Sequence, residues 1–309
     1  KNKNYIILGS GGFIGSKLYK DIKSINKTIC ISRSKKNNKN IHYKCNILKD
    51  DSWYKFIKKK SIIYFLAFEN DLYKFEKNSI DFTKDYSNFC LRLSNYIINK
   101  KLNVSIIFTS TVTIYGNTKN KVINEKNYAQ PISFYDFNKF MIENFFIYFS
   151  RINKIKFISL RLSNVYGSNN SSRQKNRGFL NKVIKNAYNK KDLFAYNGGK
   201  YYRDYIYIDD VIKALIISSK KIATLNGHFY NLCYGKSYKI VDVLKLIQKK
   251  VKKIGINIDI KNKKFPKNIH DIEKRSFHGS NTLFFKKTGW KPSIALEKGI
   301  DKILYSLKN

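Results

Sequence analysis

A glycine-rich turn near the start of the chain constrains the fold more than any other feature. The apolar segment Tyr5–Leu8 leads directly into Gly9-Ser-Gly-Gly12-Phe-Ile-Gly15, and an apolar helical pattern begins at about Phe13. Glycines let the backbone turn tightly and approach a pyrophosphate, whose charge the amides and dipole of the following helix hold. The spacing is G-x-x-G-x-x-G, because Ile14 stands where the strict G-x-G-x-x-G pattern has its last glycine. An ordinary strand-to-helix loop is the alternative. Because an apolar strand precedes the glycines and an apolar helix follows them, the turn predicts a dinucleotide-binding unit.

Strands and helices alternate through the first two thirds of the chain. The apolar pattern predicts strands at Tyr5–Leu8, Thr28–Ile31, Ile41–Tyr43, Ile62–Leu66, Val104–Phe108 and Phe157–Leu160. It predicts helices from about Phe13, near Trp53, through Leu91–Leu93 and around Tyr135. This alternation is typical of an α/β fold with a doubly wound parallel sheet of the Rossmann type, and the consecutive apolar residues indicate a sheet covered on both faces.

The pattern changes after about residue 168, where the polar loop Ser168–Ser172 begins. The remaining chain mixes predicted strands with predicted helices: Phe229–Leu232 and Ile256–Ile260 as strands, and Asp209–Ser218, Tyr238–Lys253 and Ala295–Leu307 as helices. We therefore predict a cofactor-binding domain over residues 1–168. Residues 169–309 should mainly form a smaller α/β lobe for the substrate, and part of this segment can return to the sheet domain.

Composition narrows the class of protein. At 309 residues and 43% hydrophobic, the chain is long enough to bury a large core. No apolar run is long enough for a membrane span or a signal peptide, so the sequence predicts a soluble cytoplasmic protein without a membrane partner. The net charge of +40 comes from lysines spread along the whole chain, which disfavours nucleic-acid binding yet attracts phosphorylated ligands. The cysteines and histidines lack metal-ligand spacing, so no metal site is predicted.

A tyrosine and a lysine lie four residues apart, at Tyr135 and Lys139, downstream of the hydroxyl-rich segment Thr109-Ser-Thr111. On a helix this spacing puts both side chains on one face, where they can act on the same bound molecule. A phenol is a poor base near neutral pH, but a nearby cation lowers its pKa. Such a pair arises by chance in a chain with 23 tyrosines, so the glycine turn upstream decides in favour of a proton-transfer unit.

These three motifs, in this order, resemble the extended short-chain dehydrogenase/reductases. The resemblance is closest to the epimerase/dehydratase branch, which acts on nucleotide sugars. It continues through Leu160–Gly167, Gly199–Val211, Tyr230–Leu232 and Gly289–Pro292 and so covers nearly the whole chain. Carried over by position, Thr111 is the hydroxyl that hydrogen-bonds the reacting sugar oxygen. Tyr135 is the general acid/base, and Lys139 binds the nicotinamide ribose and lowers the pKa of the tyrosine.

The resemblance also implies a nicotinamide cofactor. Its binding residues would be Gly9, Gly12, Phe13, Ile14, Gly15, Ser32, Arg33, Asn46, Ile47, Leu66, Ala67, Thr109 and Lys139. At the end of the second strand an acid would accept hydrogen bonds from the ribose 2'-OH, but this chain has Ser32-Arg33 there. Because Arg33 can pair with a 2'-phosphate, NADP(H) is favoured over NAD(H). A solvated basic turn, continuing through Ser34-Lys-Lys36, is the alternative.

The predicted partner is a nucleotide-diphosphate sugar. The resemblance makes Asn164 and Arg203 substrate contacts, with Arg203 and the later Arg275 on the diphosphate, where guanidinium groups suit anionic oxygens. The alternatives are surface charges for the arginines and a turn residue for Asn164. Apolar helices such as Phe140–Phe149 are expected to form a homodimer.

Three positions depart from the family pattern. Val112-Thr113 follows Thr111 where relatives that remove water across C5 and C6 carry two acids, so a 4,6-dehydratase is disfavoured. Asn46 replaces an aspartate that binds adenine, and its amide partly imitates the carboxylate. Tyr86 falls where an asparagine is typical.

The chemistry that remains is hydride transfer at a sugar carbon, C4 by preference. The residues favour an NADPH-dependent 4-ketoreductase, since Ser32-Arg33 suits the cofactor of a net reduction. A 4-epimerase that retains NAD(P) uses the same residues and stays open as the alternative. A non-catalytic NADP-binding sensor or scaffold ranks lower, because such proteins commonly lose the tyrosine or the lysine.

Overall fold

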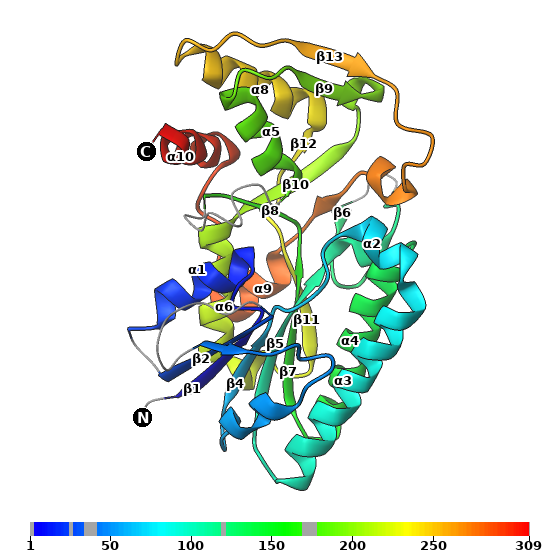
Figure 1. Ribbon diagram of the computed structural model, residues 1–309, viewed down its shortest axis with the longest axis vertical. Coiled ribbons are helices and arrows are strands. Elements are labelled where there is room, and N and C mark those ends of the chain that lie inside the picture. Colours follow the sequence, from blue (N-terminus) through cyan, green and yellow to red (C-terminus); the bar gives the residue numbers. More distant parts are fainter. Residues whose placement is uncertain (1–2, 25–26, 34–41, 119–121, 169–177, 309) are drawn as a thin grey trace. The chain divides into compact units, whose positions relative to one another are not determined.

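The computed structural model describes residues 3–24, 27–33, 42–118, 122–168 and 178–308 (Figure 1). The chain divides into two compact units. The first comprises Lys1–Ile114, Pro131–Arg161 and Ile212–Tyr230, and the second comprises Tyr115–Gln130, Leu162–Val211 and Asn231–Asn309. The chain thus crosses between the units several times, whereas the sequence predicted a boundary at residue 168 with part of the later chain returning to the sheet domain. Most of the predicted polar loop at 168–172 lies outside the described residues.

A seven-stranded sheet organises the first unit, in the order β11-β7-β5-β4-β1-β2-β3. Its strands are β1 (Asn4–Leu8), β2 (Lys27–Ser32), β3 (His42–Lys44), β4 (Ile62–Phe65), β5 (Ser105–Thr111), β7 (Lys156–Leu162) and β11 (His228–Leu232). The pairs β1–β2, β1–β4, β2–β3 and β4–β5 are parallel. The strand order reverses between β1 and β4, which is the switch point where doubly wound sheets bind ligands. The predicted Rossmann-type α/β fold is confirmed.

Helices cover both faces of this sheet. They are α1 (Phe13–Ile22), α2 (Leu72–Lys77), α3 (Ser79–Asn99), α4 (Phe134–Arg151), α6 (Ile208–Lys220) and α7 (Ile222–Leu225), with short 3-10 turns η1 (Ser52–Phe56) and η2 (Val112–Tyr115). Phe65 of β4 packs against Phe89 of α3, 5.0 Å between ring centroids, while the hydroxyl of the preceding Tyr64 donates to the Leu215 carbonyl of α6. Successive strand residues point to opposite faces, so α3 and α6 lie on opposite sides, and α4 packs beside α3 (Figure 1).

A buried ion pair fixes α4 to the sheet. Arg161 of β7 donates to the carboxylate of Glu143, which also accepts a 2.6 Å hydrogen bond from the Ser159 hydroxyl. The guanidinium lies 3.5 Å from the ring centroid of Phe229 on β11. Removing one partner of such a pair would leave an uncompensated buried charge. The pair therefore holds the helix that carries Tyr135 and Lys139 in one position.

The second unit contains small sheets and a group of helices. The strands are β6 (Val122–Ile123), β8 (Asn164–Tyr166), β9 (Leu193–Tyr196), β10 (Tyr202–Tyr207), β12 (Ser237–Lys239), β13 (Ile260–Lys263) and β14 (His278–Gly279). The helices are α5 (Phe179–Tyr188), α8 (Ile240–Lys252), α9 (Thr282–Thr288) and α10 (Leu296–Lys308), with 3-10 turns η3 (Asn197–Gly199) and η4 (Asp271–Lys274). Across the described part of the chain, no helix is both long and apolar enough to cross a membrane.

Three predicted elements need correction. Phe229–Leu232 is not a strand of the small lobe, because it joins the edge of the seven-stranded sheet as β11. The predicted helix Tyr238–Lys253 begins at Ile240, since Ser237–Lys239 pairs with β10. The predicted strand Ile256–Ile260 is displaced to Ile260–Lys263, because the backbone amide of Ile256 closes the end of α8 on Val251 and pairing with β9 starts only at Ile260.

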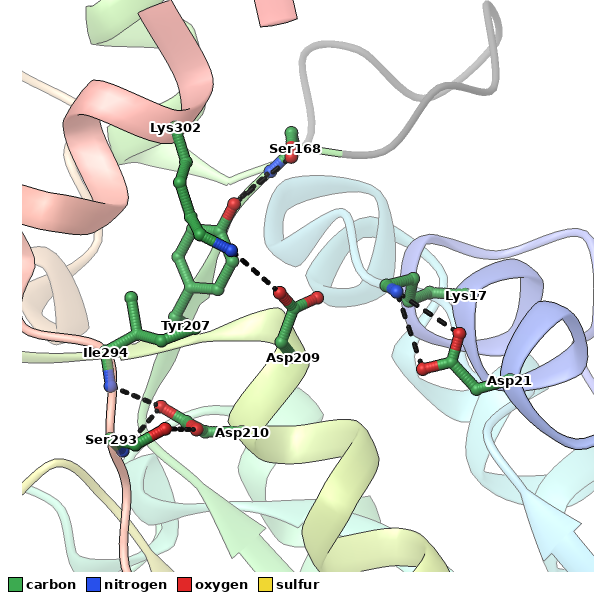
Figure 2. Close-up of polar contacts among 9 residues, drawn as sticks. All are labelled: Lys17, Asp21, Ser168, Tyr207, Asp209, Asp210, Ser293, Ile294 and Lys302. Atoms are coloured by element: carbon green, nitrogen blue, oxygen red, sulfur yellow. Dashed lines mark hydrogen bonds and ion pairs between the residues drawn. The ribbon is translucent and has the colours of Figure 1, made fainter. Parts of the chain in front are cut away.

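A carboxylate at the start of α6 holds the segment before α10. Asp210 is completely buried and accepts hydrogen bonds of 3.0 Å from the backbone amides of Ser293 and Ile294, and of 2.9 Å from the Ser293 hydroxyl (Figure 2). Its neighbour Asp209 is partly exposed and forms a 3.4 Å ion pair with Lys302. The two adjacent acids therefore differ in how much of the second unit depends on them.

This difference predicts unequal effects of two alanine substitutions. Asp210→Ala leaves the amides of Ser293 and Ile294, the second of them buried, without their acceptor and should lower the free energy of unfolding by about 3 kcal/mol. Asp209→Ala removes a partly exposed ion pair with Lys302 and should cost less than about 1 kcal/mol. Urea denaturation followed by circular dichroism measures both. Equal losses in the two variants would contradict the role given to Asp210.

Candidate active site

The glycine turn at the end of β1 packs so closely that side chains cannot enter it. Gly9 has a φ of +91°, and a Cβ there would lie 2.8 Å from the backbone nitrogen of Ala67. A Cβ on Gly15 would lie 2.3 Å from the carbonyl oxygen of Gly9. Gly12 donates its amide to that same carbonyl at 2.8 Å and precedes α1, which has no acid in its first turn. The turn can therefore present helix amides to a phosphate, as its sequence predicted.

The other predicted cofactor residues gather at the carboxyl edge of the sheet. Ser32 ends β2 and its carbonyl accepts from Cys45 after β3, which brings Arg33 and Asn46 to neighbouring strand ends. Arg33 is exposed, and the side-chain oxygen of Asn46 accepts from the Leu48 amide at 3.3 Å. The remaining predicted cofactor residues are buried or half-buried: Phe13, Ile14, Ile47, Leu66 and Ala67.

Lys139 lies inside the protein, with 4% of its surface exposed. Its amine donates a 2.7 Å hydrogen bond to the Thr109 carbonyl and lies 4.0 Å and 4.8 Å from the ring centroids of Phe68 and Phe108. Burial lowers the pKa of this amine to about 7, against the opposing charge of Asp136. The predicted pair shares one helix face, since the Lys139 amine lies 5.9 Å from the ring centroid of Tyr135.

Aromatic rings surround the half-buried Tyr135. Phe68 and Phe75 form T-shaped pairs with its ring, with centroids 5.3 Å and 6.0 Å away. Tyr86, the departure noted in the sequence, stacks on Phe68 at 4.3 Å, and its hydroxyl accepts from the Glu69 amide at 2.9 Å. Burial raises the pKa of Tyr86, so this phenol stays neutral and serves as a packing and hydrogen-bonding group.

Thr111 belongs to a chain of polar side chains that sequence reasoning missed. Its hydroxyl lies 2.8 Å from that of Thr113, and the Thr113 hydroxyl donates to the carboxylate of Asp136. The other oxygen of Asp136 accepts from Ser133 at 2.7 Å. Ser133-x-x-Asp136 has the spacing of a helix capping box, and Thr111-x-Thr113 that of one strand face. Those two spacings were the available signals, but nothing in the sequence joined them.

The predicted substrate residues belong to the second unit. Arg203 on β10 is 6% exposed and donates to the carbonyls of Tyr202, Arg275 and Glu273. Burial lowers the pKa of Arg203 to about 10, and the neighbouring charge of Arg275 adds to this. Asn164 on β8 donates to the Asp204 carbonyl at 2.9 Å. The two arginines therefore lie together, with Asn164 on the adjacent strand of the same small sheet.

The lowered pKa of Lys139 predicts a pH-dependent stability. Between pH 10 and 7 the unfolded chain binds a proton on this amine that the folded chain does not, so the wild-type protein loses stability as the pH falls through this window and no more below about 7. Lys139→Met removes this titrating amine. As the pH falls from 10 to 7, the free energy of unfolding of the variant should therefore rise relative to that of the wild type by up to about 4 kcal/mol. Thermal melts from pH 6 to 10, with the exposed Lys154→Met as control, measure the difference. A difference that does not change with pH would contradict the burial argument.

Several curated proteins are similar to this chain. A putative UDP-glucose 4-epimerase from Methanocaldococcus jannaschii is 26% identical over 66% of this chain and 63% of its own length. A dTDP-4-dehydro-6-deoxyglucose reductase from Escherichia coli is 29% identical over 66% of this chain and 61% of its own, so these matches span less than two thirds of the relatives. A dTDP-D-glucose 4,6-dehydratase from Dictyostelium discoideum is 27% identical over 98% and 81%.

A solved structure shares the fold. The UDP-glucose 4-epimerase of Thermotoga maritima superposes with a TM-score of 0.86 at 22% identity, covering 99% of this chain and 98% of that one. The family model described as the NAD dependent epimerase/dehydratase family matches residues 5–233, from β1 to the residue after β11. With the glycine turn, the Tyr135–Lys139 pair and Thr111 all inside that range, this chain belongs to the NAD dependent epimerase/dehydratase family.

Proposed function

We propose that this protein is an NADPH-dependent 4-ketoreductase of nucleotide sugars. One observation carries the proposal: a tyrosine, a buried lysine with a pKa near 7 and a strand-end threonine meet at the carboxyl edge of a sheet that begins with a phosphate-binding glycine turn. These are a proton donor, a cation that tunes it and a hydroxyl for the reacting oxygen. The similarity to a 4-dehydro sugar reductase supports the direction of the reaction.

The chain's own residues handle the proton and the oxygen in this reaction. NADPH supplies the hydride when it is bound. Neutral Tyr135 gives its proton to the alkoxide that develops on the sugar, and protonated Lys139 stabilises the tyrosinate that remains. The Thr109 carbonyl holds the lysine amine in place at 2.7 Å. Thr111 contacts the reacting oxygen through its hydroxyl.

The substrate's diphosphate is assigned to Arg203 and Arg275. The backbone carbonyls that orient the Arg203 guanidinium carry no net charge, so they do not neutralise its positive charge. Asn164 is assigned to the sugar or its nucleotide. We also propose that the protein is a homodimer formed through α3 and α4, because both helices expose large apolar side chains: Ile80, Leu91, Phe134, Phe137 and Tyr148.

The alternative reaction is 4-epimerisation with a retained cofactor. It uses the same tyrosine, lysine and threonine, and the similarity to UDP-glucose 4-epimerases favours it. A 4,6-dehydratase is disfavoured, because Val112 and Thr113 offer no carboxylate directly after Thr111. A non-catalytic NADP-binding sensor ranks below both, since the three reactive side chains are retained.

The Tyr135 hydroxyl is the proposed proton donor, so its removal tests the proposed catalysis. Tyr135→Phe should lower turnover by about a hundredfold to ten-thousandfold, because proton transfer is lost, while NADPH affinity persists. The assay follows NADPH absorbance with dTDP-4-dehydro-6-deoxyglucose and tests interconversion of UDP-glucose and its C4 epimer without added cofactor. Tyr128→Phe, at a tyrosine that is 90% exposed and lies outside α3 and α4, is the matched control. Unchanged turnover in Tyr135→Phe would reject the assignment, and cofactor-free interconversion in the wild type would select the epimerase.

The Arg33 side chain is the proposed contact for the 2'-phosphate of NADPH. Arg33 is exposed at the end of β2, so Arg33→Ala should raise the dissociation constant for NADPH by about tenfold or more through the lost charge-assisted hydrogen bonds. The dissociation constant for NADH, which lacks the 2'-phosphate, should not change. Fluorescence titration with both cofactors measures the two constants. Equal changes for NADPH and NADH would mean that Arg33 does not read the 2'-phosphate.

A further inference from the structure

A buried carboxylate lies behind the threonine that is assigned to the substrate. Asp136 follows Tyr135 in the first turn of α4 and has no exposed surface. One of its oxygens accepts from Ser133 and the other from Thr113. The Thr113 oxygen in turn lies 2.8 Å from the Thr111 oxygen. The four side chains form one continuous hydrogen-bonded chain from the helix to the end of β5.

The number of available protons fixes which group donates and which accepts in each of these hydrogen bonds. An ionised carboxylate only accepts, so the single hydroxyl proton of Thr113 is used on Asp136. The proton between the two threonines must then come from Thr111. The Thr111 oxygen also accepts from the Thr113 amide at 3.2 Å. With its own proton committed to Thr113, Thr111 can meet a further ligand only as an acceptor.

Helix capping explains half of this arrangement. Ser133 precedes α4 and accepts from the Asp136 amide at 3.1 Å, and an acid in the first turn of a helix is favourable on its own. Capping accounts for the oxygen that faces Ser133. It does not account for the second oxygen, which contacts a residue of η2 after β5, 23 positions earlier in the chain.

We propose that Asp136 is a positioning residue that commits the Thr111 proton to Thr113, so that Thr111 accepts a hydrogen bond from the sugar and favours the hydroxyl over the keto form of the reacting carbon. The proposal rests on the proposed function, in which Thr111 contacts the reacting oxygen. A hydroxyl group on the sugar can donate to Thr111. A ketone cannot, so it must draw the Thr111 proton away from Thr113 or do without that contact.

Asp136→Asn keeps the shape of the side chain but reverses the direction of the hydrogen bonds from residue 136 to Thr111. The Ser133 hydroxyl keeps the amide oxygen as its acceptor, so the amide nitrogen faces Thr113 and donates to it. Thr113 then donates to Thr111, whose proton becomes available to the sugar. The variant should bind the keto form more tightly and the hydroxyl form more weakly, each by about fivefold, the effect of one hydrogen bond.

Dead-end complexes allow this comparison without turnover. Isothermal titration measures dTDP-4-dehydro-6-deoxyglucose with NADP+, and its borohydride-reduced 4-hydroxy forms with NADPH, because neither pair can transfer hydride. Thr113→Val removes the connecting hydroxyl and is the second variant. On its own it should weaken the preference for the hydroxyl form, and in its presence Asp136→Asn should no longer change the ratio of the two dissociation constants.

Each outcome decides the proposal. A shift of the ratio in Asp136→Asn that disappears in the Thr113→Val background supports it. An unchanged ratio in both single variants, or a shift that persists without the Thr113 hydroxyl, overturns it while leaving the proposed function intact. A purely structural role would lower the melting temperature and weaken both complexes equally. Failure of the wild-type protein to bind or convert either sugar would overturn the proposed function, and this inference with it.

Discussion

The burial of one lysine amine determines how the first unit is arranged around its reactive edge. An amine removed from water is costly unless it is hydrogen-bonded. It donates to the Thr109 carbonyl at the end of β5 and lies against the faces of Phe68 and Phe108. That contact ties the middle of α4 to one strand end. Tyr135 and Asp136, one turn earlier on the helix, are placed by the same contact.

Local features of this site could be predicted from the sequence because their causes are local. Gly15 is required by steric contacts with Gly9 and Ser10 within a single turn, and the lysine follows the tyrosine at the spacing of one helix face. The strands of the sheet were found because β4 is apolar throughout and β5 contains the apolar run Ile106–Phe108, and both strands are buried along their whole length. Each of these signals lies within about ten residues of sequence.

The elements that the sequence did not predict depend on contacts between distant residues. β11 reads as any short strand, and only its pairing beside β7 makes it part of the large sheet. The start of β13 depends on its partner β9, more than sixty positions earlier. Arg203 was assigned to the substrate from the resemblance to the family pattern, whereas its backbone partners come from the segment at 273–275. Asp136 was overlooked for the same reason, since its partner Thr113 lies in another element.

The direction of the hydroxyl chain bears on the choice between reductase and epimerase. Both reactions use the same tyrosine, lysine and threonine, so the identity of these residues cannot separate them. A reductase binds a ketone and releases an alcohol, and a threonine that only accepts would hold its product more tightly than its substrate. An epimerase begins and ends with alcohols, and its intermediate ketone must rotate within the site to present its other face. A Thr111 that binds both alcohols and loosens on the ketone suits that sequence of steps. In the proposed assignments, Arg33 favours a reductase through the cofactor, whereas Asp136 favours an epimerase through the substrate. The choice between the two proposed reactions therefore depends on where the Thr111 proton lies.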